Sequence, residues 1–138
     1  MLGGHFSVIT TLKRSIPALK KNLKNYGLYD NCVSLSSVDI PVLELESNLN
    51  LTEQKIEEKI KEILDNSDTE IFVLGCAGMA DFAVKMKKKY NIPVIEGISV
   101  AVKFAESFID LDLKTSSRNS FATPRSKKFT GIFKNFEV

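Results

Sequence analysis

Cysteine and histidine are scarce in this sequence, whose 138 residues include two cysteines and one histidine. Cys32 and Cys76 stand far apart in the chain, so they form neither a disulfide framework nor a metal site with short ligand spacing. We expect both to be free thiols, and we expect no bound metal. His5 has no ligand or base partner near it in the sequence, which favours a surface or packing role.

Long hydrophobic runs and a secretion signal are also missing. The longest apolar stretch, residues 71–80, contains Gly75 and Cys76 and stops at Asp81, whereas a membrane-spanning helix needs about 20 apolar residues. The N-terminal residues have neither the basic nor the apolar region of a signal peptide. A formal net charge of +2 gives no reason to expect a nucleic acid or a membrane as partner. These features predict a cytoplasmic protein.

The signatures of nucleotide and metal enzymes are absent as well. The sequence has no GxGxxG, P-loop, HExxH or Ser/His/Asp pattern, and each of these patterns serves one particular chemistry. Internal repeats and low-complexity segments are not detected either. We therefore expect a small-molecule site that works without a nucleotide or a metal.

What the sequence does contain is an alternation of strand and helix patterns. Residues 6–12 are β-branched and aromatic, as in a strand, and lead into a helix that we expect to be capped by Ser15 and to stop at Gly27. Apolar residues at helical spacing from 56 to 64 predict a longer helix, capped by Asn50 or Thr52. The other expected elements are strands at 32–35, 69–75 and 92–95 and helices at 80–90 and 99–109.

This alternating order predicts an α/β fold. Strands that alternate with helices form a parallel sheet with helices on both faces, joined by right-handed crossovers. We expect a four-stranded, doubly wound sheet with flanking helices in residues 1–113, which is an ordinary size for one domain.

The character of the chain changes at Lys114. Residues 114–138 interleave hydroxyl groups and cations and lose helical or strand periodicity, so we expect an irregular C-terminal tail. The tail is too apolar for a solvated arm, and it should pack on a surface that need not be in this chain. Its phenylalanines are Phe121, Phe129, Phe133 and Phe136.

The candidate site lies at the carboxyl ends of the strands, where parallel sheets bind their ligands. Cys76 directly follows an apolar strand and precedes a helix, whose positive N-terminal end favours a thiolate. Ala77 and Gly78 place small side chains and N–H groups where a carboxylate or enolate oxygen can be held. Further loops at this edge follow Thr11, Leu35 and Glu96.

Each of these residues also has a structural interpretation. Cys76 can be a small buried hydrophobic residue at a strand end, and spacing alone gives both interpretations equal weight. The glycines on both sides of it favour the functional one. Cys32 begins its strand, at the opposite edge of the sheet, so a structural role is favoured there. The lysines at 85–89 suit the solvated end of a helix.

Five blocks of the sequence resemble consecutive blocks of hydantoin racemases, members of the aspartate/glutamate racemase superfamily. They occur in the family's order and span most of the chain, which makes the combination specific although each block alone is not. The blocks are FSVITT at 6–11, IPVLELE at 40–46, LGCAGMA at 74–80, IPVIEG at 92–97 and VAVKFAES at 100–107.

The resemblance implies a cofactor-independent enzyme with two similar α/β lobes that face each other across a cleft. Each lobe brings one cysteine: one thiolate removes a proton from the stereogenic carbon, and the opposite thiol returns one to the other face. By motif, Cys76 matches the cysteine of the second lobe, and Ala77 and Gly78 match its backbone donors. Thr10 and Thr11 match a threonine pair that lines the cleft. The implied substrate is a 5-substituted hydantoin or a related small acid.

One departure from the family is large, because family chains carry a whole N-terminal lobe before the block that begins here at Met1. Cys32 cannot replace that lobe's cysteine, since it lies at the wrong edge of the sheet. The tail at 114–138, which in the family returns towards the first lobe, is expected to pack on that missing lobe or on a partner chain. We expect a homo-oligomer or a second lobe-supplying chain as partner, and little or no racemase activity from the chain alone. The alternatives are another isomerase or decarboxylase of the superfamily completed by a second chain, or a truncated product or small-anion-binding module without catalysis.

Overall fold

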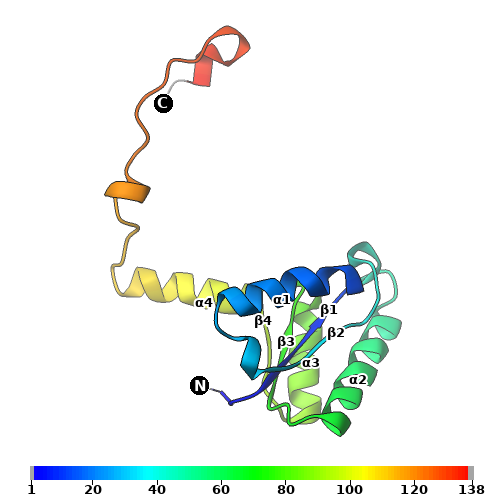
Figure 1. Ribbon diagram of the computed structural model, residues 1–138. Coiled ribbons are helices and arrows are strands. Elements are labelled where there is room, and N and C mark those ends of the chain that lie inside the picture. Colours follow the sequence, from blue (N-terminus) through cyan, green and yellow to red (C-terminus); the bar gives the residue numbers. More distant parts are fainter. Residues whose placement is uncertain (1, 137–138) are drawn as a thin grey trace. The chain divides into compact units, whose positions relative to one another are not determined.

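A four-stranded parallel sheet organises the chain in the computed structural model, which describes residues 2–136. The strands are β1 (Phe6–Thr10), β2 (Cys32–Ser37), β3 (Ile71–Leu74) and β4 (Val94–Glu96). Their order across the sheet is β2-β1-β3-β4, and every pair is parallel (Figure 1). The predicted α/β fold is thereby confirmed.

Four α-helices follow the strands in turn. They are α1 (Ile16–Asn25), α2 (Leu49–Asn66), α3 (Ala80–Tyr90) and α4 (Gly97–Asp110). Figure 1 shows α1 on one face of the sheet and α2 and α3 on the other. This is the arrangement that right-handed crossovers produce when the chain reverses direction across the sheet.

The main core lies between the sheet and the pair α2 and α3. Ile9 and Phe72 point from the strands into this layer, and Ile56 and Ile60 meet them from α2. All four are fully buried. The apolar stripe predicted for the longer helix is therefore the face that α2 packs into the core, as expected from its helical spacing.

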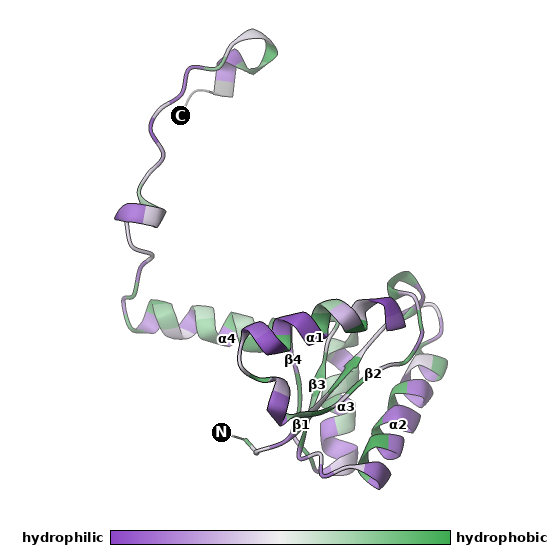
Figure 2. Cartoon of the chain, viewed as in Figure 1, coloured by the Kyte–Doolittle hydropathy of each residue, from purple (hydrophilic) through white to green (hydrophobic). Residues whose placement is uncertain are grey.

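The other face of the sheet is covered less completely. Helix α1 buries none of its residues fully, and a hollow of about 410 Å³ remains between it and the strands. Leu19 and Leu23 of α1 line this hollow together with Val8, Val73 and Ile95 of the sheet. Figure 2 shows apolar residues along this part of the strands.

The start and end of several elements differ from the prediction. Strand β1 ends at Thr10 rather than residue 12, because the next segment turns into a 3-10 helix at Lys13–Ser15. The side chain of Ser15 makes no capping hydrogen bond. Gly27 does stop α1: it has a φ of +67°, the left-handed conformation that glycine adopts without strain.

The cap of α2 is Asn48, so the prediction of Asn50 or Thr52 was wrong. The side-chain oxygen of Asn48 accepts the N–H of Leu51 at 3.1 Å. Thr52 is buried, and its hydroxyl donates to the backbone oxygen of Leu45 at 2.9 Å. The threonine therefore fixes the loop before the helix instead of capping it.

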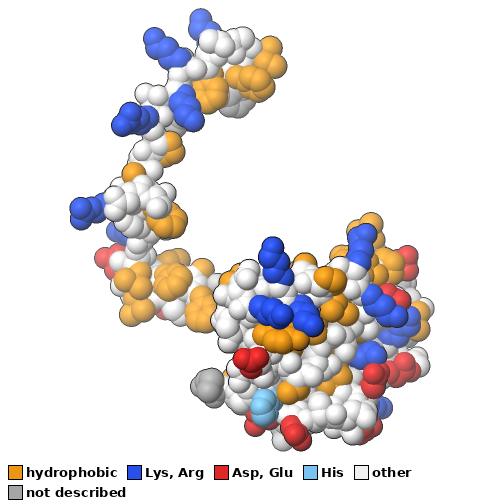
Figure 3. Space-filling view, in the orientation of Figure 1, with side chains coloured by type: hydrophobic (Ala, Val, Ile, Leu, Met, Phe, Trp, Pro, Cys, Tyr) orange, Lys and Arg blue, Asp and Glu red, His pale blue; other side chains and the backbone are white. Residues whose placement is uncertain are grey.

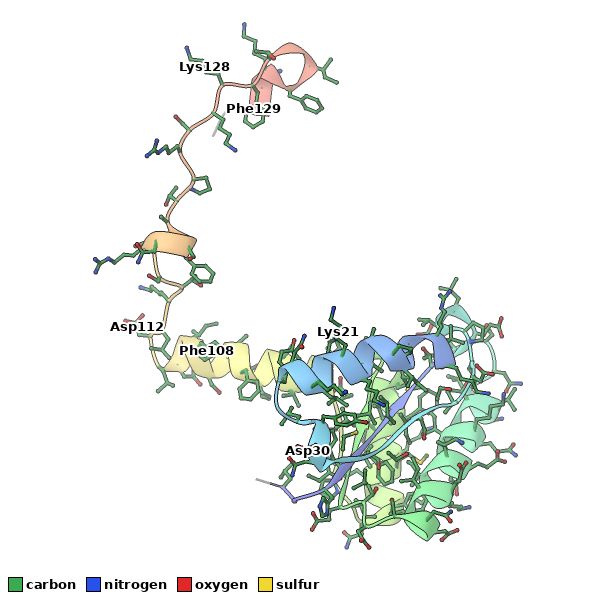
Figure 4. The ribbon with its side chains drawn as sticks, viewed as in Figure 1. Lys21, Asp30, Phe108, Asp112, Lys128 and Phe129 are labelled. Atoms are coloured by element: carbon green, nitrogen blue, oxygen red, sulfur yellow. The ribbon has the colours of Figure 1, made fainter. Side chains whose placement is uncertain are left out.

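The chain divides within α4 into two compact units, Met1–Phe104 and Ala105–Val138. The expected lobe of residues 1–113 stays a prediction. After α4, the described residues contain 3-10 turns at Asn119–Phe121 and Gly131–Phe136 and neither strand nor α-helix. Figure 4 shows Lys128 and Phe129 in this segment. Glu137 and Val138 of the expected tail lie outside the described residues. What the tail packs on stays a prediction.

The described part of the chain has neither a membrane-spanning helix nor a cluster of metal-binding side chains. No helix there is long and apolar enough to cross a membrane. Within the same residues, no group of three or more His, Cys, Asp or Glu side chains is placed to hold a metal ion.

Candidate functional site

The carboxyl ends of β1 and β3 lie side by side at one edge of the sheet. The N–H of Gly75 donates to the backbone oxygen of Ile9 at 2.8 Å, which continues the pairing of these strands beyond Leu74. A Cβ added to Gly75 would lie 3.6 Å from the Cβ of Thr10. The structure therefore brings the Thr10–Thr11 loop and the Gly75–Cys76 loop together, as the strand order requires.

Cys76 stands where β3 passes into the next helical segment. Its backbone is extended, with φ −146° and ψ 135°, and it is the N-cap of a 3-10 turn, Ala77–Met79, that leads into α3. Its carbonyl accepts the N–H of Met79 at 3.0 Å. The cysteine is half-buried and packs against the core, which fixes its backbone on a rigid strand end.

The residues next to Cys76 leave this edge open. Gly75, Ala77 and Gly78 are all exposed. Because Ala77 and Gly78 are the first residues of the 3-10 turn, their N–H groups have no acceptor within it. Such groups at the start of a helical segment suit an anionic oxygen. That a substrate oxygen accepts from Ala77 and Gly78 stays a prediction.

Gly78 has a packing role that the sequence did not reveal. A Cβ at this position would lie 2.9 Å from Cδ1 of Leu45 and 3.9 Å from Sγ of Cys76. Leu45 is fully buried and comes from the loop before α2. The glycine therefore lets that loop close over the core next to the thiol.

Thr10 and Thr11 are less accessible than the cysteine. Both threonines are buried, at 2% and 4% exposed. Their carbonyls accept the N–H groups of Val38 and Ile40, at 3.0 and 3.1 Å. These bonds hold the loop after β2 beside the loop after β1, and the predicted contact of the threonines with substrate stays a prediction.

Glu96 ends β4 at the same edge, and both oxygens of its carboxylate accept hydrogen bonds. Its two carboxylate oxygens accept the N–H groups of Ile98 and Ser99, at 2.7 and 2.9 Å, which caps the start of α4. The hydrogen bond from the Ser99 side chain, together with these N–H groups, lowers the pKa of Glu96 although burial opposes the shift. Glu96 therefore stays charged and serves as a cap. In the sequence, the signal for this capping role was a glutamate directly before a helical pattern.

A polar hollow of about 300 Å³ lies beside the end of β2. Lys13, Ser37, Asp39 and Lys55 are among the residues that line it, whereas Cys76 is not. Asp39 has a φ of +57°, a conformation that aspartate tolerates better than most residues. The sequence predicted a loop here but did not single out these side chains.

Cys32 and His5 lie at the opposite edge of the sheet, as predicted for Cys32. Cys32 is the first residue of β2, and its thiol donates to the backbone oxygen of Ser34 at 3.3 Å. Burial raises the pKa of this thiol. The N–H of His5 donates to the carboxylate of Glu70 at 2.8 Å, and the backbone oxygen of His5 accepts the N–H of Glu70 at 3.1 Å. Both cysteines are free thiols.

Comparison with known proteins gives a consistent set of relatives. The family model for Asp/Glu/hydantoin racemases matches residues 1–105. A hydantoin racemase of Pseudomonas sp. (strain NS671) is 33% identical over 99% of this chain and 55% of its own length. The hydantoin racemase of Rhizobium meliloti is 37% identical, over 91% of this chain and 52% of its own length.

Solved structures agree with these matches. Allantoin racemase from Klebsiella pneumoniae superimposes with a TM-score of 0.85 at 36% identity, covering 96% of this chain and 54% of that one. Allantoin racemase from Pseudomonas fluorescens gives a TM-score of 0.79 at 37% identity. The chain spans about half the length of the relatives it matches. By sequence and by structure, this chain belongs to the Asp/Glu/hydantoin racemase family.

Proposed function

We propose that the chain is a cysteine-bearing lobe of a hydantoin racemase-type enzyme, with Cys76 as its acid/base group. The observation that carries the proposal is the position of Cys76 at the carboxyl edge, as the cap of a helical segment, in a chain of this family. Ligands bind at that edge in parallel α/β sheets. Cys32 is at the opposite edge and does not compete for the role.

The proposed reaction is a proton transfer at carbon. As a thiolate, Cys76 takes the proton from C5 of the hydantoin ring, and the C–H electron pair moves into the adjacent carbonyl as an enolate. A second thiol on the other face gives its proton to C5, and the carbonyl reforms. The first sulfur is then a thiol and the second a thiolate, so the pair is ready for the reverse reaction.

The first amides of the 3-10 turn would stabilise the enolate. The N–H groups of Ala77 and Gly78 are exposed next to Cys76 and can donate to an oxygen that gains negative charge in the transition state. Fixed donors of this kind stabilise developing charge without having to reorganise. Thr10 and Thr11 are proposed to border the substrate from the neighbouring strand end.

A 5-substituted hydantoin is the substrate class that we favour. The relatives named above are hydantoin and allantoin racemases, and allantoin is itself a hydantoin with a substituent at C5. The C5 proton of such rings is acidic because the adjacent carbonyl accepts the charge. A weak acid of this kind suits a thiolate as its base.

One thiol alone supports only half of the reaction. It can remove the proton and return one to the same face, which exchanges hydrogen with solvent but keeps the configuration. Inversion needs a second acid on the opposite face. We therefore expect a single copy of the chain to exchange the C5 hydrogen and to racemise the substrate slowly or not at all.

Deuterium exchange tests this assignment. The chain is incubated with an optically pure 5-substituted hydantoin in D2O, and loss of the C5 proton is followed by NMR while optical rotation reports inversion. We expect exchange above the buffer rate with the wild type and with Cys32→Ser, and at the buffer rate with Cys76→Ser. Exchange that survives Cys76→Ser would refute the role of this cysteine.

A further inference from the structure

Helix α2 carries one polar residue on its core face. The buried residues of this helix are Thr52, Ile56, Ile60 and Ile63, which recur at three- and four-residue spacing, as an apolar stripe does. Figure 3 shows charged side chains over the outer surface of α2, on the side away from this stripe. Thr52 is 1% exposed. A hydroxyl buried this completely lowers stability unless it is hydrogen-bonded, so its partner explains its presence.

The partner of Thr52 is the backbone of the loop before α2. The hydroxyl donates to the backbone oxygen of Leu45 at 2.9 Å, and the N–H of Leu45 donates to the backbone oxygen of Val42 at 3.2 Å. Both backbone groups of Leu45 are therefore hydrogen-bonded, and its side chain is fully buried. Leu45 is held from two sides, by α2 and by the 3-10 turn Val42–Glu44.

The side chain of Leu45 packs against the turn that follows Cys76. A Cβ on Gly78 would lie 2.9 Å from Cδ1 of Leu45 and 3.9 Å from Sγ of Cys76, so the leucine methyl group and the thiol approach the same point. Met79, the last residue of the turn Ala77–Met79, is fully buried. Leu45 therefore supports this turn between its two fixed ends, one on the strand and one in the core.

We propose that Thr52 is a positioning residue for the candidate site: its hydroxyl holds Leu45 against Gly78 and so keeps the N–H groups of Ala77 and Gly78 directed at a substrate oxygen. The inference rests on the proposed function, in which these amides stabilise the enolate. Fixed donors stabilise developing charge because they need not reorganise, and a displacement of about 1 Å can lower a rate about 100-fold. Thr52 acts only through Leu45.

Thr69 provides a matched control for the loss of a buried hydroxyl. It is 8% exposed, and its hydroxyl is hydrogen-bonded to that of Ser7 at 2.6 Å. It precedes β3, at the edge of the sheet opposite Cys76. Thr52→Val and Thr69→Val each keep the shape of the side chain and remove one buried hydroxyl. A loss of stability alone should therefore appear in both variants.

The position of the turn can be measured without any substrate, by two-dimensional amide NMR of the full chain. We expect Thr52→Val to shift the amide signals of Ala77, Gly78 and Met79, whereas Thr52→Ser, which keeps the hydroxyl, should stay close to the wild type. Thr69→Val should leave these three signals in place. Signals that do not move in Thr52→Val, or that move equally in Thr69→Val, would overturn the proposal.

A second variant keeps the test decisive if Thr52→Val does not fold. Leu45→Val withdraws the Cδ1 methyl group from Gly78 and leaves the hydroxyl of Thr52 in place, so it should shift the same amide signals. Unchanged signals in Leu45→Val would overturn the proposal as well, because the effect of Thr52 is transmitted through this side chain.

Deuterium exchange at C5 of the hydantoin shows whether the position of the turn affects the chemistry. We expect the maximal exchange rate of Thr52→Val to be about 10- to 100-fold below that of the wild type, with KM changed much less, because the amides act mainly in the transition state. Thr52→Ser should recover most of the rate. Thr69→Val should exchange at the wild-type rate at a temperature where circular dichroism shows all variants folded.

The outcomes separate this inference from the proposed function. Exchange at the wild-type rate by Thr52→Val, or an equal loss in Thr69→Val, would overturn the inference and leave the role of Cys76 intact. A wild type that exchanges no deuterium would refute the proposed function, and the amide signals would still decide whether Thr52 positions the turn.

Discussion

At the scale of single residues, Gly78 connects the candidate site to the core. The sequence marks this glycine as a place where an anion can approach, but the structure places it against Leu45. A neighbour that is distant in the sequence is not visible in the local pattern, so only the fold shows this constraint. The loop that carries the thiol and the loop before α2 can therefore pack closely because Gly78 has no side chain.

Gly78→Ala should lower the free energy of unfolding, because the added methyl would lie 2.9 Å from Cδ1 of the buried Leu45. Overpacking of this kind costs about 1 to 3 kcal/mol. Gly75→Ala is the control, since its methyl would meet Val8, Ile9 and Thr10 at 3.5 to 3.6 Å, an ordinary contact distance. Urea unfolding of both variants measures the difference. Equal stability of the two variants would contradict the packing role of Gly78.

At the scale of elements, the sequence predicted features that follow from apolar periodicity, and it missed features that depend on where other segments lie in the fold. The apolar spacing of α2 was sufficient to identify its buried face, because burial of that face drives the periodicity. Its cap was not predictable in the same way. Asn48, Asn50 and Thr52 are all suitable caps, and the choice between them depends on where the preceding loop turns. The bond from Thr52 to Leu45 helps to decide that position.

The contact between α2 and α3 makes stability depend on pH. Glu57 of α2 binds Lys89 of α3 at 2.6 Å and Lys61 at 3.0 Å, and Tyr90 donates to it at 3.2 Å. The hydrogen bonds from Lys89 and Lys61 lower the pKa of Glu57 from 4.5 to about 2. Burial, followed by the charge of Glu57, raises the pKa of Tyr90 to about 12.

The sign of the effect follows from the lowered pKa of Glu57. Its folded-state pKa is below its unfolded value, so its contribution is complete above pH 4.5 and is lost as the pH falls towards 2. We therefore expect the urea midpoint of unfolding to be higher for the wild type than for Glu57→Gln at neutral pH. The difference between the two midpoints should shrink as the pH falls through this window. Glu62→Gln, which removes a charge from an exposed pair with Lys59, should show a smaller gap. A gap for Glu57→Gln that stays constant down to pH 2 would contradict the assignment.

At the scale of the whole molecule, the fold places one thiol at the carboxyl edge of the sheet, while the proposed proton transfer with inversion needs two. Mixing copies of the chain shows where the second thiol comes from. If each active site takes Cys76 from two copies, racemisation in mixtures of wild type and Cys76→Ser should fall as the square of the wild-type fraction, because only wild-type pairs hold both thiols. A linear decline with Cys76→Ser would mean that each copy works with a second acid from elsewhere, and sharing of Cys76 between copies would be wrong even if Cys76 is the acid/base group.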